Sequence, residues 1–337
     1  MTARTVAVVG ATGAVGTEML ATLERRRFPV GTIRLMASER SAGRVVETPW
    51  GRATVEDLDR VDPSGIDIAL FSAGAARSRA HAPRFAEAGA VVVDNSSAFR
   101  MEPSVPLVVA GVNDEAAQRH RGIIANPNCT TMVLMMALAP LHRVAGLSRL
   151  VATSYQSVSG TGLEAIAELR DQVDTLGEDP DSLRFGGWVE PVVAAYSRPI
   201  GWNVLPHAGS FTDRGYTDEE WKLVNETRKI LDAPGAAVEA LCVRVPVVVG
   251  HGIAAFAWFD RAVGPEEAAE VIASGPGVRV WTDRVPTPLD SAGVDDVLVG
   301  RIRETLGTPG GIALWAVGDN LRKGAALNAV QVAELVV

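Results

Sequence analysis

Cys129 is the residue of this chain whose type and setting best suit covalent chemistry. It lies in the segment 126–131, Asn-Pro-Asn-Cys-Thr-Thr, between a short apolar run at 122–125 and a longer one at 132–139. This order predicts that the thiol stands in the first turn of a helix, where free N–H groups and the dipole favour a thiolate. A thiolate is the reactive form of cysteine, so the sequence indicates a covalent nucleophile, with an inert buried thiol as the alternative.

His251 is the histidine best placed to transfer protons. It follows the apolar run 245–249 and is flanked by Gly250 and Gly252, so its ring is expected at the end of a strand. Imidazole titrates near neutrality and can carry the proton of a thiol, although a turn histidine with local hydrogen bonds is the alternative. Asn128 is expected to cap the helix of the thiol and is also a candidate to polarise the reacting carbonyl.

Three glycines between the first apolar strand and the first helix predict a dinucleotide site. Gly10, Gly13 and Gly16 permit a tight turn and the close approach of a pyrophosphate to the helix N-terminus. After the second strand, where an NAD enzyme usually has an acidic ribose ligand, the segment 38–41 carries Arg40 and two serines, and this chemistry favours NADP. Glu39 in the same segment keeps a solvated surface loop as the alternative. The expected cofactor contacts in this part of the chain are Gly10, Thr12, Gly13, Ala14, Val15, Ser38, Arg40 and Ser41.

The elements that must position these groups fall into two sets. In the first third, strands alternate with helices, which predicts a Rossmann-type, doubly wound parallel sheet in an α/β protein. Clustered strands after Cys129 predict an α+β domain with a mixed sheet. We place an NADP-binding domain at 1–127, completed by a C-terminal helix at 320–337, and a catalytic and dimerisation domain at 128–319. Strands are expected at 6–9, 32–37, 66–71, 90–93, 107–110, 122–125, 149–157, 240–249, 253–259, 278–281, 297–303 and 312–317, helices at 14–26, 77–88, 163–176 and 217–231, and a mostly irregular excursion at 177–215.

Bulk composition limits the function classes. The chain has 337 residues, 47% of them hydrophobic and 21% charged, which suits a globular protein of two domains. A net charge of -8 argues against a general nucleic-acid binder. No apolar run is long enough to span a bilayer, and we see no signal peptide. We therefore expect a cytoplasmic protein without a metal site, with Cys129 and Cys242 as free thiols.

Taken together and in order, the motifs of this chain resemble the aspartate-semialdehyde dehydrogenase family. The resemblance implies reversible conversion of L-aspartate-4-semialdehyde, phosphate and NADP to L-aspartyl-4-phosphate and NADPH by a homodimer. This reaction is the branch step toward lysine (via diaminopimelate), threonine and methionine. The segments that carry the resemblance are 10–16, 37–43, 94–100, 126–131, 155–160, 243–246, 250–251 and 319–324.

The resemblance implies a role for each polar group near the thiol. Cys129 is the nucleophile that forms a thioester, and His251 is the acid/base catalyst. Gln156 orients the substrate near the thiol. Arg244 binds the substrate carboxylate, for which a planar guanidinium is suited. Further cofactor contacts implied by the resemblance are Ser159, Gly160 and Asn320.

Three more charged residues are implied as substrate ligands. Glu219 corresponds to the group that binds the substrate ammonium, while Lys222 and Arg100 correspond to phosphate ligands. Glu219 and Lys222 are three residues apart on one expected helix, so they face the same side. An ordinary surface ion pair is the alternative for these two, and a structural ion pair is the alternative for Arg100. Thr217 and Glu220 are expected to form a capping box at the start of this helix.

Four positions depart from the usual residues of the family, namely Gly111, Val248, Val249 and Gly252. They leave a specialised paralogue that uses a related acyl phosphate as an alternative. The nearest enzymatic alternative is an N-acetyl-γ-glutamyl-phosphate reductase, whose substrate has an acylated nitrogen in place of an ammonium. A non-catalytic NADP-binding protein is an alternative from a different functional class.

Overall fold

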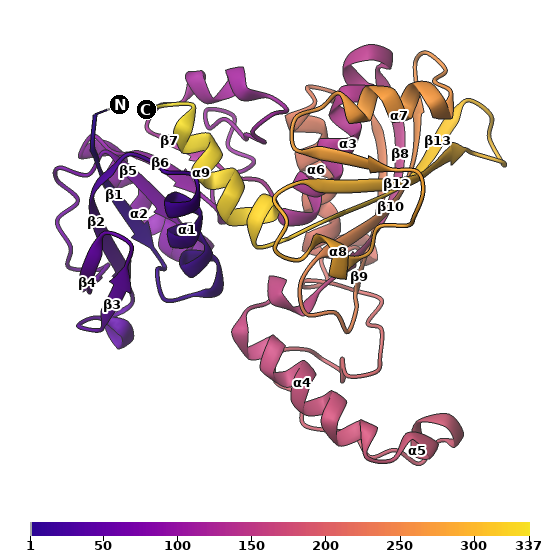
Figure 1. Cartoon of the computed structure of the whole chain (residues 1–337), viewed down its shortest axis with the longest axis horizontal. Coiled ribbons are helices and arrows are strands. Elements are labelled where there is room, and N and C mark those ends of the chain that lie inside the picture. The colour runs from indigo at the N-terminus through magenta and orange to yellow at the C-terminus, as the bar shows by residue number, and fades with distance from the viewer. Residues whose placement is uncertain (1) are drawn as a thin grey trace.

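Two β-sheets organise the protein, one in each half of the chain (Figure 1). The structure is a computed structural model that describes residues 2–337. Helix α3 (Cys129–Ala145) leaves the last strand of the first sheet and leads into the first strand of the second. Helix α9 (Leu327–Glu334) returns from the second sheet and packs against α1 (Ala14–Arg25) in the first domain.

The first sheet has seven strands in the order β3-β4-β2-β1-β5-β6-β7, and all neighbours are parallel except β3 and β4. Its central strands are fully buried runs of valine, alanine and leucine because α1, α9 and α2 (Ala75–Glu87) cover its faces. This confirms the predicted Rossmann-type sheet. Its strands are β1 (Arg4–Val9), β2 (Val30–Ala37), β3 (Val45–Thr48), β4 (Gly51–Asp57), β5 (Ile68–Phe71), β6 (Val91–Asp94) and β7 (Ile123–Ala125).

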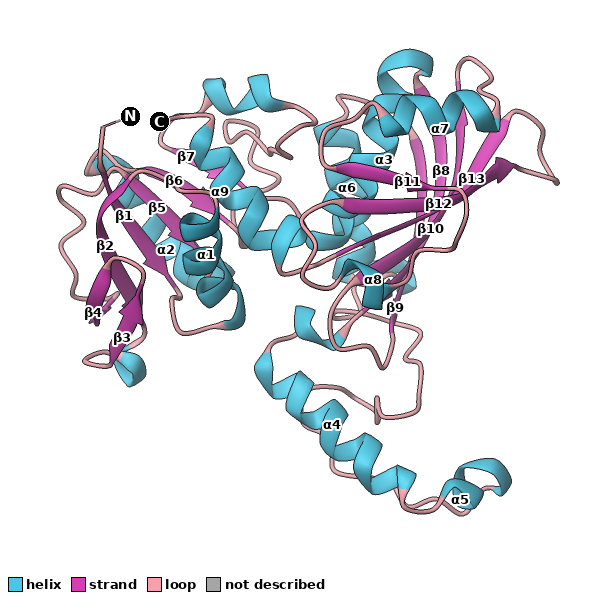
Figure 2. Cartoon of the chain, viewed as in Figure 1, coloured by secondary structure: helices cyan, strands magenta, loops and turns pink. Residues whose placement is uncertain are grey.

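The second sheet has six strands in the order β11-β12-β13-β10-β8-β9, with mixed parallel and antiparallel pairs, as predicted. Helices α3, α6 (Asp218–Ile230) and α7 (Pro265–Ala273) pack on it and share its hydrophobic core. Helices α4 (Leu163–Gly177) and α5 (Pro180–Phe185) project from it as an arm, and α8 (Pro288–Ser291) is a single turn (Figure 2). The strands are β8 (Leu147–Gln156), β9 (Ala237–Arg244), β10 (His251–Phe259), β11 (Val278–Trp281), β12 (Val297–Glu304) and β13 (Gly311–Gly318).

Three sequence-based predictions of secondary structure are wrong. Residues 107–110 form only an isolated bridge, because the Asn328 side chain binds Val108 O and Ala110 N in place of a neighbouring strand. The strand expected at 240–249 ends at Arg244, and the backbone then turns.

The C-terminal segment is not one regular helix from Asn320. It begins with a π-helical turn (Arg322–Ala326) before α9, and this turn brings the backbone of Gly324 against Cys129. Such π-turns occur often at functional sites. Within residues 2–337, no helix is both long and apolar enough to cross a membrane.

Candidate active site

A cavity of about 310 Å³ lies where the two domains meet. Its wall comes from the starts of α1, α2 and α3, from α6, and from the segments after β8 and β13. The structure therefore brings together residues that are more than 300 positions apart in sequence. The sequence-predicted site residues in its wall are Val15, Arg100, Asn128, Cys129, Gln156, Ser159, Gly160, Glu219, Lys222, Arg244 and Asn320.

Strand ends of the second sheet converge on this cavity. Gln156 and Arg244 are the last residues of the parallel strands β8 and β9 and are paired in register. His251 is the first residue of the antiparallel strand β10, so it lies at the same edge of the sheet. Asn320 follows the end of β13, which pairs with β10. Residues separated by as many as 164 positions thus meet because strand direction and register place them together.

Cys129 is the first residue of α3, as predicted, and Asn128 is the N-cap. The Asn128 Oδ1 accepts hydrogen bonds from the backbone N–H of Thr130 at 3.0 Å and of Thr131 at 3.3 Å. The thiol nevertheless is not poised as a thiolate. Although part of Cys129 faces the cavity, burial and the negative charge of Glu219 raise the pKa of the thiol to about 11. The expected effect of the helix N-terminus is therefore outweighed in this structure.

His251 lies behind the cavity wall and is completely buried. Its Nδ1 lies 3.1 Å from the backbone nitrogen of Ser157 and 3.1 Å from the Ser157 Oγ. A backbone N–H can only donate, so Nδ1 is the acceptor and the imidazole carries its proton on Nε2. This Nε2 has no hydrogen-bond partner among residues 2–337, and a Cβ atom added to Gly160 would lie 3.3 Å from it. Burial and the Arg244 charge lower the pKa of His251 to about 3.

A buried polar network connects His251 to Asn320. The Ser157 hydroxyl lies 3.0 Å from Asn320 Oδ1, which also accepts the backbone N–H of Gly250 at 2.9 Å. The Asn320 amide donates to Ser159 Oγ at 2.9 Å. Ser159 and Asn320 both line the cavity, so the network fixes the wall that separates the cavity from His251.

Arg244 presents a partly unsatisfied guanidinium to the cavity. Its Nη1 donates to the Ser157 carbonyl oxygen at 2.7 Å, while its buried Nε has no partner within the described part of the chain. The guanidinium also lies 5.8 Å from the centre of the Tyr196 ring, which comes from the excursion after α5. Free donors on a rigid planar group suit a carboxylate ligand.

One face of α6 supplies the next charged groups. Lys222 Nζ donates to Glu219 Oε1 and to Asp218 Oδ2, each at 2.6 Å, and Asn128 Nδ2 donates to Glu219 Oε2 at 2.8 Å. Burial opposes the charge of Glu219, but Lys222 and Asn128 hold the pKa of this carboxyl below its usual range. The predicted capping box between Thr217 and Glu220 is present at the start of α6.

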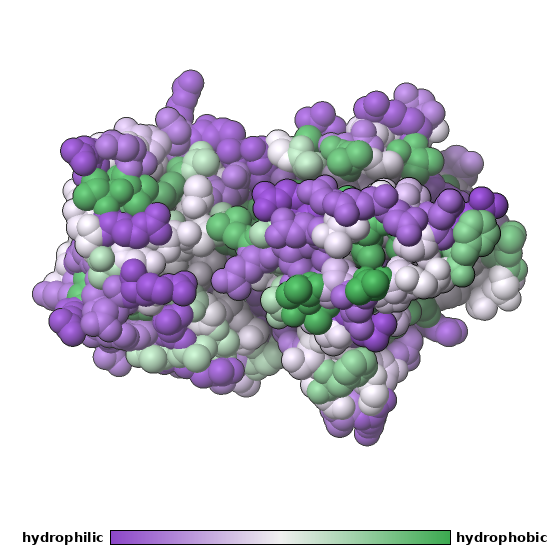
Figure 3. Space-filling view, turned by 90° about the horizontal axis from the view of Figure 1, so that it is seen from below, coloured by the Kyte–Doolittle hydropathy of each residue, from purple (hydrophilic) through white to green (hydrophobic). Residues whose placement is uncertain are grey.

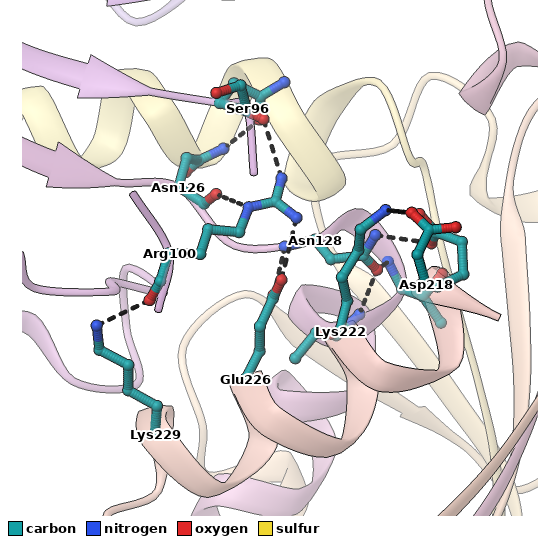
Figure 4. Close-up of polar contacts among 12 residues, drawn as sticks. Ser96, Arg100, Asn126, Asn128, Asp218, Lys222, Glu226 and Lys229 are labelled. Atoms are coloured by element: carbon teal, nitrogen blue, oxygen red, sulfur yellow. Dashed lines mark hydrogen bonds and ion pairs between the residues drawn. The ribbon is translucent and has the colours of Figure 1, made fainter. Parts of the chain in front are cut away.

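Arg100 is a buried residue of the cavity wall, and its contacts are drawn in Figure 4. Its Nε donates to Asn126 O and its Nη2 donates to Asn95 O, both at 2.9 Å. Its Nη1 donates to Glu226 Oε1 at 3.0 Å. Glu226 was not predicted as a site residue, although it continues the face of α6 that carries Glu219 and Lys222.

The glycine loop is a tight turn that leads into α1. A Cβ atom at Gly10 would lie 2.2 Å from Ser72 O, and one at Gly16 would lie 2.2 Å from Gly10 O. Only glycine fits at either position, and the loop ends at the N-terminus of α1. Arg40 is exposed beyond the end of β2, in a short 3₁₀ turn whose Ser41 is buried. The other predicted cofactor contacts, namely Thr12, Gly13, Ala14 and Ser38, lie in or beside these two segments and outside the cavity wall.

Asn95 and Ser96 also line the cavity and had no predicted role, although the segment 94–100 had been recognised as a motif. Asp94 fixes their loop by accepting hydrogen bonds from the hydroxyls of Ser78 and Ser96, each at 2.7 Å. The four departing positions, namely Gly111, Val248, Val249 and Gly252, lie outside the wall of this cavity. Among the described residues, no cluster of three or more His, Cys, Asp or Glu side chains is arranged to hold a metal ion.

Comparisons with known proteins agree with this geometry. Residues 5–120 match the family model described as semialdehyde dehydrogenase, NAD binding domain, and residues 138–323 match semialdehyde dehydrogenase, dimerisation domain. The aspartate-semialdehyde dehydrogenases of Streptomyces akiyoshiensis and Mycolicibacterium smegmatis are 52% and 49% identical, and each alignment covers 98% of both chains. The solved structure of aspartate semialdehyde dehydrogenase II of Vibrio cholerae complexed with ASA superposes on this chain with a TM-score of 0.94 and 42% sequence identity. The match covers 100% of this chain and 98% of the Vibrio cholerae chain. The chain belongs to the aspartate-semialdehyde dehydrogenase family.

Proposed function

We propose that the protein is an NADP-dependent, phosphorylating aspartate-semialdehyde dehydrogenase. It interconverts L-aspartyl-4-phosphate and L-aspartate-4-semialdehyde in the biosynthesis of lysine (via diaminopimelate), threonine and methionine. The observation that supports this most is one cavity that holds a thiol together with separate groups suited to a carboxylate, an ammonium and a phosphate. These are the three charged groups of aspartyl phosphate.

In the biosynthetic direction, the Cys129 sulfur attacks the acyl carbon of the substrate. A carbon–sulfur bond forms, the carbon–oxygen bond to phosphate breaks, and inorganic phosphate leaves the resulting thioester. When bound, the reduced nicotinamide cofactor supplies the hydride that this thioester needs for reduction to the aldehyde. The proton of the Cys129 thiol passes to His251 as the sulfur attacks, and the resulting imidazolium returns this proton to the sulfur when the aldehyde is released. Asn128 and Gln156 orient the reacting carbonyl beside the thiol.

The charged groups of the wall select the substrate. Arg244 binds the α-carboxylate through donors that the protein leaves free, and Glu219 pairs with the α-ammonium. Lys222 and Arg100 bind the phosphate. A substrate with an acylated nitrogen would place a neutral group against the ionised Glu219, which disfavours the N-acetylated alternative.

The residues present fit a nicotinamide dinucleotide, and we assign NADP. Gly10 and Gly16 give the pyrophosphate access to the N-terminus of α1. An exposed guanidinium at Arg40, with Ser38 and Ser41 beside it, suits the extra phosphate of NADP better than the two ribose hydroxyls of NAD. Ser159, Gly160 and Asn320 form the wall on the nicotinamide side.

We also propose a homodimer formed through the second domain. The face of its sheet away from α3 exposes the large apolar side chains of Tyr155, Leu241 and Phe256, which is unusual for a surface that stays in water. The arm adds exposed apolar residues, including Phe185. Hydrophobic patches are also visible on the face of the molecule seen from below (Figure 3). The domain boundary at 127/128 and the cytoplasmic location remain predictions.

The test is a phosphate-dependent oxidation of aspartate semialdehyde with NADP or NAD. Purified protein should reduce NADP only when the semialdehyde and phosphate are both present. Under the same conditions it should reduce NAD less efficiently than NADP. Cys129→Ala should abolish turnover, whereas Cys242→Ala should retain most of it because this buried thiol lies outside the cavity wall. Full activity in Cys129→Ala would disprove the mechanism, and preference for the N-acetylated glutamate semialdehyde would disprove the substrate.

A further inference from the structure

Glu226 connects two parts of the active site without lining the cavity (Figure 4). It projects from α6, and its side chain is only 1% exposed. Its Oε1 accepts from Arg100 Nη1 at 3.0 Å, and its Oε2 accepts from the backbone N–H of Asn128 at 2.6 Å. One buried carboxylate thus holds both a cavity-lining guanidinium and the residue that precedes Cys129.

The chemistry of these two contacts requires a carboxylate. Arg100 and the Asn128 N–H are both donors, so the side chain between them must accept at both ends. A glutamine at position 226 would have nearly the same shape but would point an NH₂ group at one of the donors. Aspartate would keep two acceptors but is one methylene shorter, which is too short to keep both contacts.

The contacts of Arg100 determine which of its donors remain free. A guanidinium has five N–H groups, and three of them are used by Asn126 O, Asn95 O and Glu226. One N–H is left on each of the two terminal nitrogens, so both can still donate to an oxyanion. The other two acceptors are neutral carbonyls, so Glu226 is the only one of the three that can balance the charge of Arg100. Burial raises the pKa of Glu226, and the charge of Arg100 and the Asn128 N–H oppose this effect.

We propose that Glu226 is a positioning residue for phosphate. It orients Arg100 so that the remaining pair of N–H groups receives the phosphate, and it fixes the start of α3 through Asn128. The inference rests on the proposed function, in which Arg100 is a phosphate ligand.

The two contacts of Glu226 differ in how easily they are replaced. Within residues 2–337, the Asn128 N–H has no second acceptor, whereas Arg100 keeps two carbonyl partners. In Glu226→Gln, the amide oxygen is therefore expected to remain with Asn128, and the NH₂ group faces Arg100. Two donors then face each other at Arg100, which is the phosphate ligand. Arg244 and Glu219, the ligands of the aldehyde substrate, keep their contacts.

The experiment compares two Michaelis constants in the full-length enzyme. In Glu226→Gln, the KM for inorganic phosphate should rise about tenfold or more, since a close charge pair is broken, while the KM for aspartate semialdehyde changes less than about twofold. Glu270→Gln, an exposed change on α7, is the matched control and should leave both constants unchanged. If Glu226→Gln does not fold, Glu226→Asp is measured in its place and should show the same selective rise.

The outcomes separate this inference from the proposed function. An unchanged phosphate KM, or an equal rise in both constants, would overturn the positioning role while leaving the proposed function intact. A wild-type enzyme that oxidises the semialdehyde without any requirement for phosphate would overturn both. A double-mutant cycle with Arg100→Lys should be non-additive if Glu226 acts through Arg100, and additive effects would also overturn the role.

Discussion

Replacing Glu219 by glutamine should make the thiol of Cys129 more reactive in the free enzyme. Burial raises the pKa of this thiol to about 11, and the carboxylate of Glu219 is the charged group that raises it most. Removing that carboxylate removes the repulsion and also leaves Lys222 less neutralised. Both changes favour a thiolate at Cys129.

The size of the effect follows from the fraction of thiolate. At pH 7.5, a pKa of about 11 leaves roughly 0.03% of Cys129 ionised, compared with roughly 9% for an ordinary thiol of pKa ~8.5. Loss of one neighbouring like charge is worth about one pKa unit, which multiplies the thiolate about tenfold. A less basic thiolate is also a weaker nucleophile, so the net gain in alkylation rate is about threefold.

The assay is alkylation by iodoacetamide between pH 6.5 and 10, followed by mass spectrometry of the peptide that contains Cys129. In the wild type, the rate should rise tenfold per pH unit across the whole range, whereas Glu219→Gln should react faster at every pH. The peptide that contains Cys242 is an internal reference, because burial raises the pKa of that thiol to about 12. Glu270→Gln serves as the control for a lost surface charge.

Two results would refute this reasoning. A wild-type rate that levels off near pH 8.5 would show that burial and Glu219 do not raise the pKa of this thiol. A Glu219→Gln variant that reacts at the wild-type rate or more slowly would show that Glu219 does not oppose the thiolate at Cys129.

Three more predictions concern the residues around the thiol. Burial lowers the pKa of His251 to about 3 from an unfolded value near 6.5, so as the pH falls the unfolded state binds this proton first, and the stability that the neutral ring contributes is present above pH 6.5 and lost toward pH 3. Between pH 7.5 and 5, the free energy of unfolding measured in urea should therefore fall by about 2 kcal/mol more for the wild type than for His251→Asn. Equal losses in the two proteins would contradict the burial effect. Ser157→Ala removes the hydroxyl that would accept a hydrogen bond from Nδ1–H of protonated His251, so kcat should fall about tenfold and the acid limb of the kcat–pH profile should move to lower pH. An unchanged pH profile would show that Ser157 has only a structural role. In Gly324→Ala, the added Cβ would lie 3.0 Å from the Cβ of Cys129, so kcat should fall while circular dichroism stays unchanged, and a wild-type kcat would show that the π-turn yields freely.

The sequence predicts most of the first sheet because its strands are continuous apolar runs. It misses the hairpin β3–β4 at one end of the sheet, because β3 has only four residues and only Val55 of β4 is buried, so neither strand is a continuous apolar run. It also predicts a strand at 107–110 from valines that are indeed buried. There the backbone partner is the side chain of Asn328, more than 200 residues away, which no local pattern can reveal.

The sequence predicts a site residue correctly where a chemically reactive side chain and the local signals for its position in a helix or strand occur in one short motif. The segment around Cys129 and the glycine-flanked His251 are examples: Cys129 lies in the first turn of α3, and His251 lies at one end of β10. The ionisation state of Cys129 was predicted wrongly, because the helix start is visible in the sequence whereas the charge of Glu219 beside it depends on the fold. Glu226 was missed for a related reason: its spacing of seven from Glu219 indicates a shared helix face, but only packing shows that this face is buried against Arg100.

The charges around the cavity link substrate recognition to the reactivity of the thiol. Glu219 has both carboxylate oxygens in contact with donors, Lys222 on one side and Asn128 on the other, yet it still raises the pKa of Cys129. A substrate ammonium at Glu219 would oppose its negative charge, so the thiolate becomes more favourable when the substrate arrives. Arg244 already lowers the pKa of Cys129, and a bound carboxylate would weaken that effect. In the proposed reaction, the carboxylate of the substrate would therefore serve mainly for binding, and its ammonium would be the group whose charge promotes the nucleophile.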